Sequence, residues 1–226
     1  MIKLCIFDLD GTVLDTVHTI AYYGNYALSK HGIQPIEDKE YNYFAGNGAV
    51  NLIKRALNFR NCLTDEIFQK VFADYNAAYN ADTSYLTAPF DGIRETLYQI
   101  KTQGIQMAIL SNKPHFATCG VITSLFGEGY FDCVYGQREN VPIKPDPTAV
   151  LEIIRELNVQ PEECLYIGDT GTAMKTGKNA NLTTVGVTWG FRDRDEIEEA
   201  GGQHFCSDVA ELAEKLEKMI HDLTMA

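Results

Sequence analysis

Short apolar runs recur along the chain, and segments with helical spacing of apolar residues separate them. Each run is nearly continuous in apolar character, which is typical of a strand buried on both faces. Strands that alternate with helices in this way predict an α/β fold, a doubly wound parallel sheet. The five predicted strands are Ile2–Phe7, Met107–Leu110, Cys133–Tyr135, Cys164–Ile167 and Thr183–Val187.

The helical segments carry residues that are typical of helix ends. Apolar residues of the segment 93–100 share one face, and Gly104 follows where that helix should stop. A later helix is expected to open at Asp146-Pro147, a capping residue followed by proline at the first helical position. The run from Asp208 to Leu223 predicts a closing helix.

The segment 16–86 breaks this alternation, because it contains only helical patterns. Thr64 is placed to cap one of its helices. A stretch of about 70 residues is too long for a loop inside a compact domain. We therefore predict an inserted α-helical domain at 16–86, above an α/β core domain formed by residues 1–15 and 87–226.

Composition and charge narrow the class of partner. Of the 226 residues 45% are hydrophobic, which is ample for a core, and the formal charge of −12 argues against nucleic acid or an anionic membrane as a partner. The N-terminus lacks the apolar run of a secretory signal, and the six scattered cysteines form no CxxC pair. We expect a cytoplasmic protein with reduced thiols and a small-molecule substrate; the oligomeric state is open.

Polar side chains stand at the carboxyl ends of the predicted strands, the edge where open α/β sheets bind ligands. Three carboxylates brought together there repel one another unless a cation lies between them. Oxygen ligands without histidine or cysteine favour Mg²⁺, and a metal beside a carboxylate nucleophile suits phosphoryl transfer. The set comprises Asp8, Asp10, Ser111, Asn112, Lys113, Lys144 and Asp169.

Four motifs, FDLDGTVLDT, SNK, IKP and GDT, follow one another along the chain. Their order and spacing resemble the haloacid dehalogenase (HAD) superfamily, and the helical insertion resembles that superfamily's α-helical cap. The segments GNGAVNLIKRAL and GVTWGFRD look like its phosphoglycolate-phosphatase-like branch. The resemblance covers essentially the whole chain and implies a phosphatase with a small phosphorylated substrate.

The resemblance also implies a role for individual residues. Asp8 attacks phosphorus and becomes an aspartyl-phosphate, and Asp10 protonates the leaving group and then activates water. Ser111 and Lys144 bind phosphoryl oxygens, while Asn112 helps to orient the nucleophile. A second aspartate at the position of Asp10 distinguishes phosphatases from the dehalogenases of the superfamily.

The implied cofactor is Mg²⁺, held by Asp8, the backbone carbonyl of Asp10, and Asp169. Many relatives carry another aspartate four residues after this last acid, and here that position is Ala173. Loss of such indirect support typically costs about 10–100-fold in metal affinity or activity. We expect a metal site that is weaker but still able to work.

In the predicted cap, Gly46-Asn47-Gly48 precedes a helix. Backbone N–H groups at that helix start could hold a substrate carboxylate, such as that of phosphoglycolate, or the glycines could form only a turn. The core motifs handle only the phosphoryl group, so a sugar-phosphate mutase or a pyrophosphatase stays open. Because position 173 is alanine, a catalytically weakened phosphate-binding protein is a further alternative function.

Overall fold

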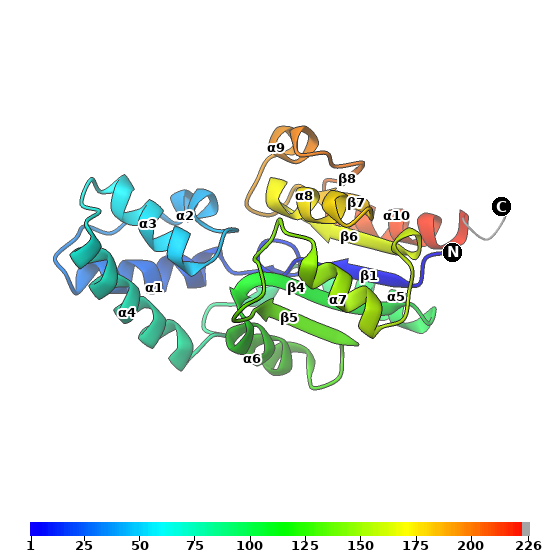
Figure 1. Ribbon diagram of the computed structural model, residues 1–226, viewed down its shortest axis with the longest axis horizontal. Helices are drawn as coiled ribbons and strands as arrows, with labels where there is room; N and C mark the ends of the chain where they lie inside the picture. The colour runs from blue at the N-terminus through cyan, green and yellow to red at the C-terminus, as the bar shows by residue number, and fades with distance from the viewer. Residues whose placement is uncertain (223–226) are drawn as a thin grey trace.

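A six-stranded parallel sheet forms the centre of the core in this computed structural model, which describes residues 1–222. The helical cap lies beside the core, at the left of Figure 1. The strand order is β5-β4-β1-β6-β7-β8, so the doubly wound parallel sheet is confirmed. The strands are β1 (Leu4–Phe7), β4 (Gln106–Pro114), β5 (Cys133–Gln137), β6 (Cys164–Gly168), β7 (Thr183–Val187) and β8 (His204–Cys206).

Strand β1 shows why its run is apolar without alternation. All four of its residues are buried: Cys5 and Phe7 contribute to the apolar cluster on one face of the sheet, and Leu4 and Ile6 to the cluster on the other. Helices α5 (Ile93–Thr102), α6 (His115–Phe126) and α10 (Val209–Asp222) pack on the first face. On the second lie α7 (Thr148–Glu156), α8 (Gly171–Asn179) and α9 (Arg194–Glu199), and the short 3-10 helix Pro161–Glu163 precedes β6.

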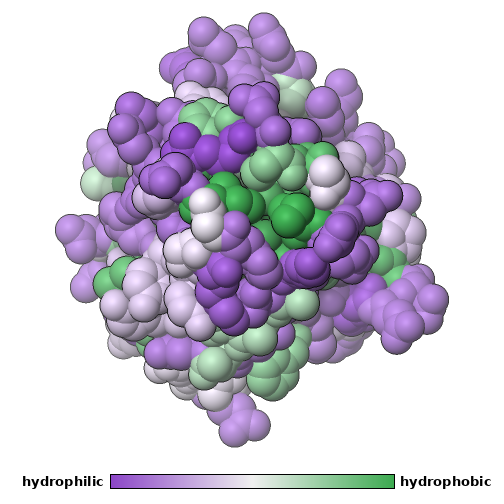
Figure 2. All heavy atoms as spheres, turned by 90° about the vertical axis from the view of Figure 1, so that its left-hand side faces the viewer, coloured by the Kyte–Doolittle hydropathy of each residue, from purple (hydrophilic) through white to green (hydrophobic). Residues whose placement is uncertain are grey.

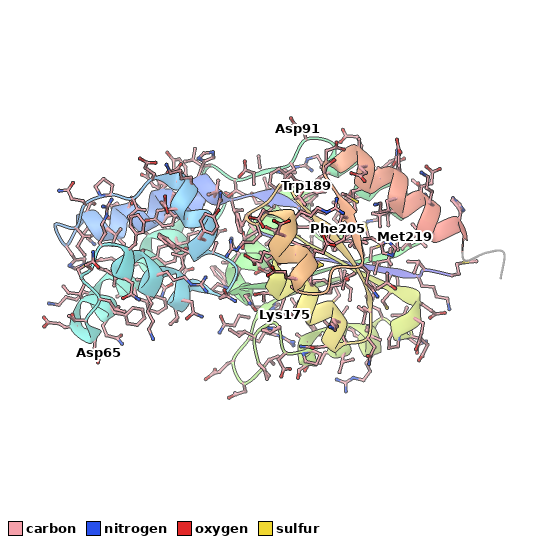
Figure 3. All side chains as sticks on the ribbon, turned by 90° about the horizontal axis from the view of Figure 1, so that it is seen from above. Asp65, Asp91, Lys175, Trp189, Phe205 and Met219 are labelled. Atoms are coloured by element: carbon pink, nitrogen blue, oxygen red, sulfur yellow. The ribbon has the colours of Figure 1, made fainter. Side chains whose placement is uncertain are left out.

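The cap has an apolar cluster of its own, to which the core adds Ala117 and Phe191. Thr64 caps its last helix, since the Thr64 hydroxyl oxygen accepts a hydrogen bond from the Ile67 N–H at 3.2 Å. Asp65, at the start of that helix, lies at the end of the cap far from the core (Figure 3). The cap helices are α1 (Val17–Ser29), α2 (Asp38–Phe44), α3 (Ala49–Phe59) and α4 (Asp65–Ala81).

Two chain crossings join the cap to the core. The first passes through β2 (Leu14–Asp15) and the second through β3 (Ala88–Pro89), and these two short strands pair antiparallel. The pairing holds both crossings side by side at the base of the cap. No helix within residues 1–222 has the length and apolar character needed to cross a membrane. None of the six cysteines forms a disulfide.

Some predicted element boundaries need correction. The helix expected to open at Asp146-Pro147 begins at Thr148, although the Asp146 carboxylate does accept from the Thr148 N–H at 2.9 Å. The second predicted strand does not end at Leu110, because β4 continues to Pro114 with a shift of register on the β5 side. The strand β8 was not predicted at all.

Other boundaries agree with the sequence. Gly104 follows α5 with a φ of +75°, a conformation that glycine adopts without strain. The closing helix α10 begins at Val209, one residue after the predicted start. Its predicted end at Leu223 lies outside the described residues.

Candidate active site

A cavity lies between the carboxyl ends of β1 and β4 and the inner side of the cap. The cavity has a volume of about 50 Å³, counted as the space that the centres of water molecules can reach. One water needs roughly 10–15 Å³ on this measure, so the volume suits a small substrate. Its core wall is made by Asp8, Asp10, Ser111, Asn112, Lys113 and Pro114, and its cap wall by Ile20, Ala45, Gly46, Gly48, Ala49, Leu52, Tyr75, Asn76, Tyr79 and Asn80.

Asp8 and Lys144 form a buried ion pair at the end of β1. The Lys144 ammonium lies 2.7 Å from Asp8 Oδ1 and also donates to the Leu110 carbonyl at 3.0 Å. The same Asp8 oxygen accepts from the Leu9 N–H at 2.8 Å. Burial raises the pKa of Asp8, while the Lys144 ammonium opposes that shift. The pair therefore presents a carboxylate next to a cation, away from solvent.

Asn112 connects three parts of the site. Its amide N–H groups donate to the Lys144 carbonyl at 3.2 Å and to the Gly46 carbonyl of the cap at 3.1 Å. Its carbonyl oxygen accepts from the Lys144 N–H at 2.9 Å. The hydrogen bonds of the Asn112 side chain thus reach Asp8 only through Lys144, so the predicted orienting role of Asn112 would act through that lysine. Nearby, the Ser111 hydroxyl oxygen accepts from the Lys113 N–H at 3.1 Å, which leaves the Ser111 proton for another acceptor.

Asp10 pairs with Lys113, a residue to which the sequence analysis gave no role. The two charged groups are 2.8 Å apart, and only 5% of the Lys113 side chain is exposed. The ammonium also lies 5.0 Å from the centre of the Tyr79 ring in the cap. The only sequence signal for Lys113 was its place in the SNK motif.

Asp169 is fully buried at the end of β6. Its Oδ1 accepts from the Thr12 hydroxyl at 3.0 Å, and its Oδ2 accepts from the Phe191 N–H at 2.8 Å. Burial, and then the charge of Asp8, raise the pKa of Asp169 to about 7. A cation between the two carboxylates would relieve this cost.

Two glycines leave room for Asp169. A Cβ at Gly11 would lie 2.1 Å from Asp169 Oδ2, and one at Gly190 would lie 2.4 Å from the same atom. Gly11 also has a φ of +82°, which disfavours any other residue. The loops after β1 and β7 can therefore approach Asp169 this closely only with glycine at positions 11 and 190.

The residues present fit a hard cation such as Mg²⁺. Of the three carboxylates that the sequence brings to this edge, that of Asp10 turns to Lys113, and only the backbone carbonyl of Asp10 was expected to hold the metal. Across residues 1–222, no three His, Cys, Asp or Glu side chains meet as metal ligands would. Asp8 and Asp169 remain, and Mg²⁺ is commonly held by one or two carboxylates together with waters and phosphate oxygens.

Ala173 lies next to this pair of acids. It is fully buried on α8, and its N–H donates to the Thr170 hydroxyl oxygen at 3.2 Å. A Cβ built on Gly168 would lie 2.4 Å from the Ala173 Cβ and 3.5 Å from the Asp8 Cβ. The side chain of an acid at position 173 would therefore start close to Asp8.

In the turn Gly46-Asn47-Gly48 of the cap, the two glycines line the cavity, whereas the side chain of Asn47 contacts other parts of the protein. Gly46 and Gly48, with φ of +99° and +82°, line the cavity just before α3. Asn47 is not among the residues that line it. Its amide N–H donates to the Thr172 hydroxyl at 3.1 Å, and its carbonyl oxygen accepts from Arg55 at 2.8 Å. The prediction of a substrate contact thus lacks support for the Asn47 side chain, which joins the cap to the core.

Arg192 is a further residue that the sequence analysis missed. Its guanidinium donates to the Ala45 carbonyl at 3.2 Å, the Tyr43 carbonyl at 3.4 Å and the Asn42 carbonyl. Glu196 pairs with its Nε at 2.9 Å. These carbonyls lie at the C-terminal end of α2. Arg192, a residue of the core, therefore supplies the hydrogen-bond donors for the end of a helix in the cap domain. Its only sequence signal was the segment GVTWGFRD.

Residues 5–187 match the family of haloacid dehalogenase-like hydrolases. The chain belongs to this family. A phosphoglycolate phosphatase of Pseudomonas putida is 30% identical over 192 residues, which cover 84% of this chain and 70% of the relative. One of Colwellia psychrerythraea is 29% identical over 211 residues, covering 92% of this chain and 93% of the relative.

Solved structures agree with this assignment. The crystal structure of a candidate phosphoglycolate phosphatase from Lactobacillus delbrueckii subsp. bulgaricus superposes with a TM-score of 0.89 at 28% identity, covering 96% of this chain and 98% of the other. The predicted superfamily, fold class and enzyme class are therefore confirmed: the chain is a HAD hydrolase of the phosphatase type.

Proposed function

We propose that this HAD phosphatase is a Mg²⁺-dependent phosphomonoester hydrolase that forms an aspartyl-phosphate on Asp8 and acts on a small metabolite such as 2-phosphoglycolate. The observation that carries the proposal is the buried Asp8–Lys144 pair, with 2.7 Å between its charged atoms, at a small cavity beneath the cap. A carboxylate beside a cation can approach phosphorus, because the cation offsets the charge of the phosphoryl oxygens.

The reaction proceeds in two displacements. In the first, Lys144 and the Ser111 hydroxyl hold phosphoryl oxygens while the Asp8 carboxylate forms a bond to phosphorus and the ester oxygen leaves. Asp10, carrying the proton that it took from water in the preceding turnover, gives that proton to the leaving oxygen. In the second, Asp10 takes a proton from water as the water attacks the aspartyl-phosphate, which releases inorganic phosphate and restores Asp8. Asp10 lines the cavity beside Asp8, as both steps require.

Asp8, Asp169 and the backbone carbonyl of Asp10 would hold Mg²⁺. Once bound, the ion supplies positive charge for the phosphoryl oxygens. Asp169 is fixed for this task by Thr12 and Phe191, each of which donates a hydrogen bond to one of its oxygens. The raised pKa of Asp169 supports the proposal, because a buried acid facing another acid is stabilised by a shared cation.

The small substrate is supported by the closed cap and by the relatives. The cavity between cap and core has a volume of about 50 Å³, which favours a small leaving group. The relatives named above are phosphoglycolate phosphatases. A cytoplasmic location belongs to the same proposal, supported by six cysteines without a disulfide.

The decisive assay is phosphate release from 2-phosphoglycolate beside a panel of sugar phosphates, with and without Mg²⁺. We expect release that requires Mg²⁺, and that Asp8→Asn and a chelator each abolish. Asp15→Asn is the matched control, because Asp15 lies on β2 and is not among the cavity's lining residues. Release from no ester at high Mg²⁺ would contradict the proposal, and phosphate transferred to a second hydroxyl would indicate a mutase.

A further inference from the structure

The charged side chains that line the cavity are unevenly distributed. All of them, Asp8, Asp10 and Lys113, come from the core. Every described cap residue that lines the cavity is uncharged. Lys144 is already engaged by Asp8 and by the Leu110 carbonyl on the phosphoryl side. Lys113 is therefore the one cation that the described cavity wall offers to a negative group on the rest of the substrate.

Lys113 has hydrogen-bonding capacity that the protein does not use. An ammonium carries three N–H donors, and buried donors normally have partners. In the chain from 1 to 222, the Lys113 ammonium donates only to Asp10 Oδ1, at 2.8 Å. Its other neighbour is the face of the Tyr79 ring, which attracts a cation but accepts no conventional hydrogen bond. Two donors of a 95% buried ammonium thus stay available at the cavity.

The position of Lys113 assigns these donors to the leaving group. Its ammonium is bound to Asp10, the residue that protonates the leaving oxygen in the proposed reaction. The opposite wall belongs to α4, where Asn76 and Asn80 lie one turn apart and present neutral amides. A negative group close to the leaving oxygen would meet the Lys113 ammonium, with Asp10 as the adjoining acid and only uncharged side chains on the cap side.

We propose that Lys113 is a specificity-determining residue that selects esters with a carboxylate on the leaving group. The ammonium binds that carboxylate with its spare donors and keeps its contact with Asp10. A neutral leaving group of the same shape leaves the two donors unpaired, which penalises its binding. This inference rests on the proposed function, and it adds to it the residue that recognises the leaving group.

The test compares two esters of the same shape, 2-phosphoglycolate and its neutral amide, 2-phosphoglycolamide. Wild-type protein is expected to prefer the acid in kcat/KM. Lys113→Gln should lower that preference by about 100-fold, because truncation of a buried charge pair is costly. Lys113→Arg should restore part of it. Lys175→Gln is the matched control, since Lys175 is exposed on α8, away from the cavity (Figure 3).

An equal loss with both esters would overturn the inference, because Lys113 would then act only by holding Asp10. Binding gives a second readout that does not depend on turnover. In the Asp8→Asn background, calorimetry should show tighter binding of the acid than of the amide, and Lys113→Gln should remove the difference. If neither ester is turned over but the acid still binds more tightly than the amide, the phosphatase proposal is rejected and the role of Lys113 in binding stands. No binding difference in the Lys113-containing protein would reject the role of Lys113.

Discussion

Ala173 stands where many members of the resembling superfamily carry an aspartate, and its position makes the consequence testable. Ala173→Asp is expected to tighten Mg²⁺ binding by about 10–100-fold, because it adds an acid beside Asp8 and Asp169. The metal-free protein should lose stability, since a further buried carboxylate adds repulsion. Calorimetric titration with Mg²⁺ measures the affinity, and Ala173→Asn supplies the same shape without the charge. Equal affinities for the two variants would contradict the expectation.

Individual residues differ in how far the sequence could predict their surroundings. Asp8 and Asp169 directly follow apolar strands, and parallel strands bring their carboxyl ends to one edge, so their proximity was predictable. The partner of Lys113 could not be predicted, because a lysine at this position can form an ion pair either with Asp10 or with a phosphoryl group. Asn47 was assigned to the substrate through backbone N–H groups of its turn; that its side chain also reaches Thr172 on the core could not be predicted, because the contact depends on how the cap sits on the core.

At the scale of elements, Arg192 links a loop of the core to the end of cap helix α2. Arg192→Ala should raise KM about tenfold, because the carbonyls at that helix end lose a charged donor and the closed cap loses stability. Steady-state kinetics measures KM, and limited proteolysis near β2 and β3 reports on the opening of the cap. Arg194→Ala is the control, since Arg194 pairs with Glu198 on the exposed side of α9. An unchanged KM together with an unchanged cleavage pattern would show that Arg192 does not hold the cap.

The predicted elements also succeeded and failed for physical reasons. Strands with continuous apolar runs were found, because burial on both faces demands that pattern. The edge strand β8 has only three residues, of which only Cys206 is buried, so its run is too short to stand out. The segment 111–114 carries site residues and reads as a loop, yet it continues β4. The polar side chains at the ligand-binding edge of the sheet therefore made the last residues of β4 unrecognisable as strand from the sequence.

At the scale of the whole molecule, cap and core bury separate apolar clusters and share few side chains. Ala117 and Phe191 are the core residues that pack into the cluster of the cap. The outer end of the cap is largely hydrophilic, with a small group of hydrophobic side chains near the middle of the view (Figure 2). Because two short paired strands join the cap to the core, we expect the cap to move against the core when a ligand enters or leaves. The cavity wall comes from both parts, so the site depends on how the cap sits on the core.

Because Asp8 and Asp169 are buried acids, we expect the proposed Mg²⁺ binding to stabilise the whole fold. At about 100 times its Kd a ligand stabilises the folded state by about 2.7 kcal/mol. For a chain of this length that corresponds to a rise in Tm of about 5–10 °C. Differential scanning fluorimetry with Mg²⁺ and with chelator measures the shift, and KCl at matched ionic strength is the control. Asp169→Asn should lose most of it. A full shift in that variant would place the ion elsewhere, since Asp169 is the one proposed ligand outside the Asp8–Asp10 loop.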